Sequence, residues 1–172
     1  GTLRMQKRLR VILQAMARLR NREQLHYVIC GEGPDMPFLQ KLTRQLHLEE
    51  RVHLLGYRTD IPDMLGAADI FCMPSRREGC GMAALEAMAA GLPLITVRSH
   101  GTKTYAEKGE SGFCLKGDLV TSCADAIEQL ADNKLLRRQM GARNRAAATA
   151  FSDADHFTKQ VGYSINYYSL IA

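Results

Sequence analysis

The chain has 172 residues, 46% of them hydrophobic, which is enough for one sizeable core and argues against two independent domains. Its net charge of +5 indicates an anionic partner or a solvated basic face. The five cysteines form no C-x-x-C pair, which argues against a disulfide framework or a zinc knuckle and favours a reducing cytoplasm. No signal peptide is recognisable, and Glu86 and Pro93 interrupt the apolar run 79–97, so we expect a soluble chain without a membrane span.

The first predicted element is an amphipathic helix, because Leu9, Ile12, Met16 and Leu19 recur at helical spacing. Its arginines fall elsewhere on the helix, and we interpret them as a solvated face. The alternative is peripheral contact with acidic lipid head groups at the inner face of the membrane. Nucleic acid is not expected as a partner, because no aromatic residues are interleaved with the basic ones and the sequence has no tryptophan.

Short β-prone runs alternate with helical patterns along the next hundred residues. The predicted strands are 26–30, 52–55, 70–73, 94–97 and 113–115, and the predicted helices between and after them include 38–48, 81–90 and 120–131. Such alternation predicts an α/β fold, a Rossmann-like parallel sheet with helices on both faces. A helical tail without a clear strand is expected from about residue 134, so residues 1–172 form a single domain.

Ligands of open parallel sheets bind at the carboxyl ends of the strands, so the loops there are the places to search. Two of them are glycine-rich turns into helices: "CGEGPDM" after the first strand and "PSRREGCGM" after the third. The first lacks the third glycine of a dinucleotide fingerprint, because Met36 stands there, which argues against an NAD or FAD site. It is either a tight turn ahead of a helix or a wall of a ligand site.

The second loop carries two carboxylates eight residues apart, Glu78 and Glu86. If a helix begins near Gly81, Glu86 lies about 7 Å along its axis while Glu78 precedes the helix, so the two bracket a helix N-terminus. That N-terminus favours a phosphate, and each carboxylate can accept hydroxyl hydrogen bonds, which is the layout of a sugar nucleotide. The alternative is that Glu86 is exposed on a solvated helix face.

The segment "ADIFCMPSRREGCGMAALEAMAAGLPLI" resembles the signature of retaining glycosyltransferases of family 4, whose GT-B fold consists of two Rossmann-like domains. Further matches are Gln6 and Lys7, "CGEGP", "VHLLGY", "DIPDMLGAADI" and the spacing in 140–145. The resemblance covers nearly the whole chain, but only the C-terminal, donor-binding half of such an enzyme. It therefore implies one half of a GT-B fold, with the N-terminal acceptor domain absent.

By this resemblance, the function is donor binding in an enzyme that transfers a sugar from a nucleotide-sugar, with UDP favoured, to a glycan or lipid-linked acceptor. Such enzymes act in cell-surface polysaccharide or glycolipid synthesis. Transfer would proceed with retention of configuration and with no cofactor or required metal. The chain alone is expected to be inactive, because half a cleft cannot exclude water or position an acceptor.

The resemblance also implies roles for individual residues. Glu78, the catalytic candidate, would hold hydroxyls of the donor sugar, and Glu86 would hold the ribose. Lys7 would neutralise the diphosphate, a task that suits a point charge on a flexible stem. The remaining donor-binding candidates are backbone contacts to the sugar and diphosphate (Gly79, Cys80, Gly81, Met82) and the wall for the base (Gly31, Gly33, Tyr57, Arg58).

Two other classes of function remain open from the residues. A sugar-nucleotide epimerase on a related two-domain fold could use similar carboxylates, but it would need acid and base residues in a complete cleft. A non-catalytic nucleotide-binding or protein-interaction module is the second alternative.

Overall fold

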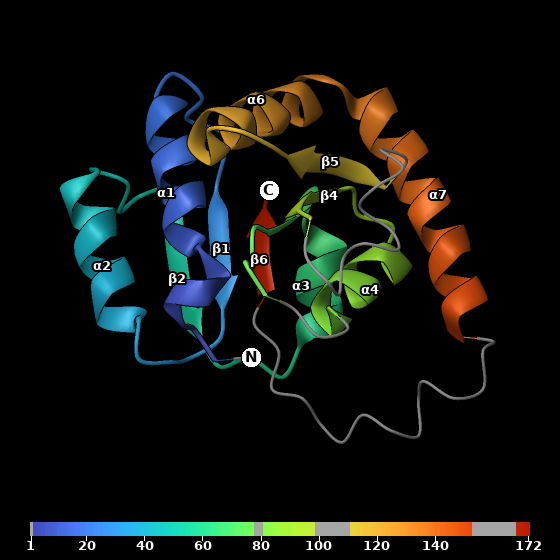
Figure 1. The fold of residues 1–172 in the computed structure, drawn as a ribbon, viewed down its shortest axis with the longest axis horizontal. Coiled ribbons are helices and arrows are strands. Elements are labelled where there is room, and N and C mark those ends of the chain that lie inside the picture. The colour runs from blue at the N-terminus through green and yellow to red at the C-terminus, as the bar shows by residue number, and fades with distance from the viewer. Residues whose placement is uncertain (1, 78–80, 99–110, 153–167) are drawn as a thin grey trace.

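The structure is a computed structural model that describes residues 2–77, 81–98, 111–152 and 168–172. Six strands form one sheet in the order β2-β1-β6-β3-β4-β5 (Figure 1). Five of these strands agree with the predicted ones to within a residue at each end, which confirms the α/β fold: β1 (Tyr27–Cys30), β2 (Val52–Gly56), β3 (Ile70–Met73), β4 (Leu94–Val97) and β5 (Gly112–Leu115).

Helices cover both faces of this sheet. They are the 3-10 turn η1 (Met5–Lys7) and the helices α1 (Leu9–Arg18), α2 (Met36–Gln45), α3 (Ile61–Ala67), α4 (Met82–Ala89), α6 (Leu119–Asp132) and α7 (Lys134–Ser152). The crossovers β1-α2-β2 and β3-α4-β4 run toward opposite edges of the sheet, so right-handed connections place α2 and α4 on opposite faces. Accordingly α1 packs against α6 while α4 packs against α7, and β3 and β4 are buried along their whole length.

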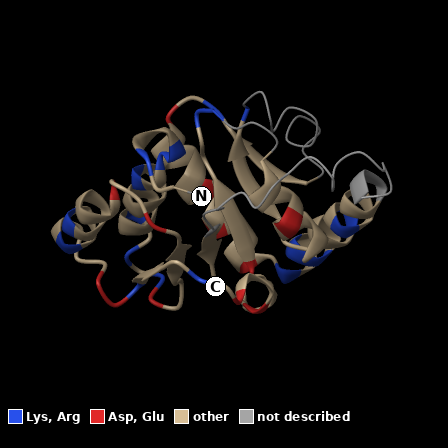
Figure 2. Cartoon of the chain, turned by 90° about the horizontal axis from the view of Figure 1, so that it is seen from below, with Lys and Arg blue, Asp and Glu red and all other residues tan. Residues whose placement is uncertain are grey.

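The predicted apolar face of the first helix is confirmed, because Leu9, Ile12, Met16 and Leu19 are all buried in the core. Basic residues lie on helices at both ends of the molecule in the view of Figure 2. None of the helices in the described ranges is both long and apolar enough to cross a membrane.

The end of the chain corrects the expectation of a purely helical tail. The helix α7 begins at Lys134 as expected, but Tyr168–Ile171 forms a sixth strand, β6, which the sequence reading missed. It lies between β1 and β3 and runs antiparallel to both, so the sheet is mixed rather than wholly parallel. Both sides of its backbone are hydrogen-bonded to neighbours, and Leu170 and Ile171 are buried, which makes this short segment a central strand.

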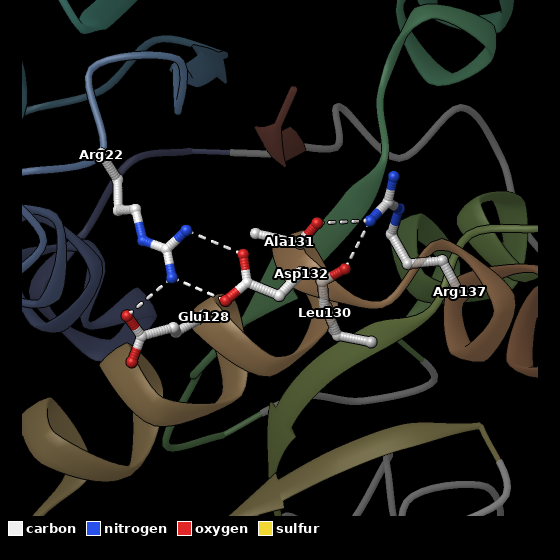
Figure 3. Close-up of polar contacts among 6 residues, drawn as sticks. All are labelled: Arg22, Glu128, Leu130, Ala131, Asp132 and Arg137. Carbon is white, nitrogen blue, oxygen red and sulfur yellow. Dashed lines mark hydrogen bonds and ion pairs between the residues drawn. The ribbon is translucent and has the colours of Figure 1, made fainter.

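One arginine near the first helix fixes α6 in place. Arg22 donates to both carboxylate oxygens of Asp132, with Nη1–Oδ1 at 2.8 Å, and to Glu128 at 3.1 Å (Figure 3). The hydrogen bonds to Asp132 and then Glu128 raise the pKa of Arg22. At the same C-terminal end of α6, Arg137 donates to the carbonyls of Leu130 and Ala131. Arg22, assigned to a solvated face from the sequence, is thus an inter-helix contact.

Candidate functional site

Three segments meet at the carboxyl edge of the sheet. The loop after β1 is joined to the N-terminal segment because Leu3 N donates to Glu32 O at 2.8 Å and Asp35 N donates to Leu3 O at 3.2 Å. The loop after β3 is joined to the same segment by Arg76 N, which donates to Gln6 O at 2.8 Å. The edge where a parallel sheet binds its ligands is therefore built from residues far apart in the sequence.

Two predicted glycines hold the first loop in this arrangement. A Cβ on Gly33 would lie 2.4 Å from the backbone nitrogen of Leu3, so the crossing of the two segments requires a glycine there. Gly31 has φ 139° and donates its N–H to Gly56 O at 2.6 Å, which ties the loop after β1 to the end of β2. The turn "CGEGP" is thus a close-packed junction of loops.

The other predicted donor-binding residues on this side lie beside that junction. Lys7 is the last residue of η1 and is half-buried. Tyr57 follows the end of β2 and is 59% exposed, so its ring is available to a planar ligand. Its neighbour Arg58 donates from Nε to Asp60 Oδ1 at 2.8 Å, and this hydrogen bond raises the pKa of Arg58 and lowers that of Asp60.

The predicted helix after the third strand begins where expected. Gly81 is the N-cap of α4 with φ 66°, a left-handed conformation that favours glycine, and Met82 is the first helical residue. Glu86 lies in the second turn of this helix. Glu78, Gly79 and Cys80 lie outside the described residues, so their predicted contacts to the donor sugar and diphosphate stay predictions.

Glu86 is half-buried and lines a cavity of about 650 Å³ between α4 and α3. The rest of its lining is apolar or small: Ile61, Pro62, Leu65, Gly66, Ala89 and Ala90. The ribose-holding role of Glu86 and the alternative of a carboxylate on a solvated helix face both stay predictions. A carboxylate in a mostly apolar cavity can accept hydrogen bonds from hydroxyl groups while the walls contact an apolar or planar surface.

The structure thus brings the predicted residues together in two groups. Lys7, Gly31 and Gly33 belong to segments that are hydrogen-bonded to one another, and Gly56 links Tyr57 and Arg58 to them. Glu86 and Met82 belong to α4, which Gly81 caps and which borders the cavity between α4 and α3. Sequence reasoning missed a third feature, an arginine-lined cavity beside Leu3. Its signal was the presence of arginines in two separate loops at the same edge of the sheet.

An α/β sheet with such loops at its carboxyl edge defines a Rossmann-like class of domain. A family model described as Glycosyl transferases group 1 matches residues 1–147, and the chain belongs to this family.

Curated relatives support the same assignment. The chain is 31% identical over 166 residues, 96% of its length, to the N-acetyl-alpha-D-glucosaminyl L-malate synthase of Bacillus anthracis, and spans 43% of that protein. It is 35% identical over 111 residues, 64% of its length, to the UDP-Gal:alpha-D-GlcNAc-diphosphoundecaprenol alpha-1,3-galactosyltransferase of Escherichia coli, and spans 29% of it. The chain therefore spans less than half the length of these relatives.

Solved structures show the same fold. Anabaena Alr3699/HepE in complex with UDP superposes with a TM-score of 0.80 at 24% identity, over 87% of this chain and 42% of that one. The C-terminal domain of the glycosyl transferase group 1 family protein LpcC from Francisella tularensis superposes with a TM-score of 0.78 at 24% identity, over 87% of this chain and 82% of that one. These likenesses confirm a GT-B type α/β domain.

Proposed function

We propose that this chain is the C-terminal, donor-binding domain of a retaining glycosyltransferase and that its ligand is a nucleotide-sugar, with UDP as the favoured nucleotide. One observation carries the proposal: Glu86 lines a mostly apolar cavity next to a helix whose N-terminus is formed by Gly81. A carboxylate there accepts the two ribose hydroxyls, and the apolar wall of α3 contacts the nucleoside.

The remaining roles follow from the layout of the carboxyl edge. Lys7 neutralises the diphosphate, and Tyr57 and Arg58, with the turn at Gly31 and Gly33, form the wall for the base. The N-terminus of α4 favours the negatively charged diphosphate through its unpaired N–H groups and its dipole. Glu78 holds hydroxyls of the donor sugar. In this scheme no metal is required, because Lys7 and the helix N-terminus provide the positive charge.

The comparisons support the choice of donor and the kind of acceptor. The Anabaena neighbour was solved with UDP and with UDP-glucose, and the name of the Escherichia coli relative specifies UDP-Gal and a diphosphoundecaprenol-linked acceptor. We infer that the complete enzyme transfers a sugar to a glycan or lipid-linked acceptor on the cytoplasmic side of the membrane, in polysaccharide or glycolipid synthesis. The acceptor is then held by a separate N-terminal domain, and the isolated donor-binding domain transfers no sugar.

A nucleotide panel tests the proposal directly. Isothermal titration of the chain with UDP, GDP, CDP and NAD should give saturable binding of UDP, weaker binding of GDP and CDP, and the weakest binding of NAD. The affinity of the nucleoside diphosphates should fall with added salt, because Lys7 and the helix dipole act through screened charge. No binding of any nucleoside diphosphate at millimolar concentration, by protein with a cooperative thermal transition, would contradict the proposal.

A further inference from the structure

Helix α7 carries a concentration of positive charge that the donor site does not use. Its 19 residues include five basic residues and no acidic one. The basic residues are Lys134, Arg137, Arg138, Arg143 and Arg145. The helix lies at the opposite end of the molecule from α2 (Figure 1), and this is one of the two basic ends seen in Figure 2. None of the residues proposed above to bind the nucleotide-sugar belongs to α7.

Most of this charge is not neutralised by the part of the chain that the structure describes. Arg137 is ion-paired with Asp69 at 3.2 Å, and Arg145 donates from Nη2 to Ala90 O at 3.0 Å, which leaves its charge without a carboxylate. The other three side chains are exposed and make no hydrogen bond or ion pair with a described residue: Lys134, Arg138 and Arg143. Four cations of one helix are therefore available to an anionic partner.

The exposed face of α7 has a definite pattern. The buried face, which packs toward α4, includes Met140, Gly141 and Asn144. On the opposite face, residues seven, four and three positions apart form one exposed, uncharged stripe along the helix: Leu135, Ala142, Ala146 and Thr149. Leu135 is 66% exposed. At about 100° per residue, Arg138 and Arg145 lie along one side of this stripe and Arg143 lies along the other.

This pattern fits a membrane surface better than a nucleic acid. In a helix that lies flat on an anionic bilayer, long cationic side chains extend sideways to the phosphates while the stripe between them faces the acyl boundary. Residues 134–149 contain no aromatic side chain that could stack on a base. A nucleic acid would also leave Leu135 in water, whereas a bilayer covers it.

We propose that the exposed face of α7 docks onto an anionic membrane surface, with the helix axis parallel to that surface. The four cations contact lipid phosphates, and Leu135 lies at the boundary of the acyl chains. The proposal does not depend on nucleotide binding, since it rests on different residues.

Vesicle co-sedimentation tests the charged part of this face. The chain is mixed with phosphatidylcholine vesicles that contain or lack phosphatidylglycerol, at fixed ionic strength. We expect binding only with phosphatidylglycerol, and the double variant Arg138→Gln/Arg143→Gln should weaken the apparent affinity on the order of tenfold. The matched control Lys41→Gln/Arg44→Gln removes the same charge from exposed positions of α2 and should change the affinity by less than about twofold.

A single introduced tryptophan tests the orientation of the helix, because the sequence contains none. In Leu135→Trp, vesicles with phosphatidylglycerol should shift the fluorescence emission to shorter wavelength, since the indole leaves water. Phe38→Trp, at a position of α2 that is 47% exposed, is the matched control and should keep its emission. Leu135→Ala should weaken vesicle binding several-fold with no change of charge. Thermal melts confirm that each variant is folded.

Four results would overturn the proposed docking face. The first is no binding to vesicles with phosphatidylglycerol, and the second is an equal loss in both double variants, which would indicate diffuse attraction by net charge. The third is an unshifted emission of Leu135→Trp on vesicle-bound protein, which would show that another face contacts the bilayer. The fourth is tighter binding of a single-stranded oligonucleotide than of vesicles, lost in Arg138→Gln/Arg143→Gln. Loss of UDP binding in Glu86→Gln leaves these outcomes unaffected, so the two proposals fail separately.

Discussion

Glu86 shows how one charge can be placed among small apolar residues. It is the single ionisable residue of α4, in the sequence MAALEAMA, and it lies on the side of the helix that borders α3. Alanines on the buried face let α4 approach the sheet closely, while the carboxylate remains half-exposed and retains part of its hydration. The local sequence therefore combines close packing on one side with a hydrogen-bond acceptor on the other.

The substitution Glu86→Gln tests this role at the level of one atom. The amide keeps the shape of the side chain but weakens two charge-assisted hydrogen bonds to ribose, so UDP affinity should fall by roughly 1.5–3 kcal/mol, or about ten- to hundredfold. The melting temperature should barely change. Glu50→Gln, at an exposed position between α2 and β2, is the matched control and should alter neither quantity. A lowered melting temperature with unaltered UDP affinity would instead identify Glu86 as a structural charge.

The packing of α7 against the end of α4 depends on a backbone contact. A Cβ on Gly141 would lie 2.1 Å from Gly91 O, so the two segments touch without a side chain between them. Close by, Asn144 is fully buried and donates from Nδ2 to Leu92 O at 2.6 Å and to Ser111 O at 2.8 Å. This contact holds α7 beside the turn that leads into β4.

Gly141→Ala should separate these two elements. The added methyl group has no space, and we expect a loss of about 1–3 kcal/mol in the free energy of unfolding, because the helix must shift and stretch the bonds of Asn144. Gly66→Ala is the control: it adds a methyl group within helix α3 with nothing within 4 Å and should be neutral or stabilising by up to about 1 kcal/mol. Urea denaturation measures both, and equal stability of the two variants would contradict the assigned contact.

Five strands and the start of α4 could be predicted from sequence because each has a local signal. Apolar runs bounded by turn residues predict strands, and Gly81 followed by alanines predicts a helix beginning. Helix α3 was not among the predicted helices, since its seven residues include Pro62 and Gly66 and show little periodicity. The cavity around Glu86 could not be foreseen for the same reason, because α3 provides its wall.

At the scale of the whole molecule, the two halves of the sheet are joined through β6. The pair β2-β1 lies on one side and β3-β4-β5 on the other, with Tyr27 and Ile70 both opposite Ile171 in register. The hydroxyl groups of Tyr27 and Ser169 are 2.7 Å apart, a buried hydrogen bond at this junction. The strand that sequence reasoning missed is therefore central to the sheet. In the sequence, Ser169 interrupts the apolar run of β6, so no clear strand pattern marks it.

The position of β6 also determines the order in which the chain can fold. The residues joined by the Tyr27–Ser169 hydrogen bond are 142 positions apart, so this contact closes a very long loop, whereas β1 and β2 are connected by a single short crossover. Loop-closure entropy makes the distant pairing slow, and we expect β6 to be unformed in the folding transition state. Leu170→Ala should then destabilise the chain by about 2–5 kcal/mol, almost wholly through faster unfolding. Val52→Ala, in the local β1-β2 pair, should slow folding. Stopped-flow refolding and unfolding in urea would distinguish the two, and a folding rate reduced in Leu170→Ala in proportion to its lost stability would show that the sheet is completed early.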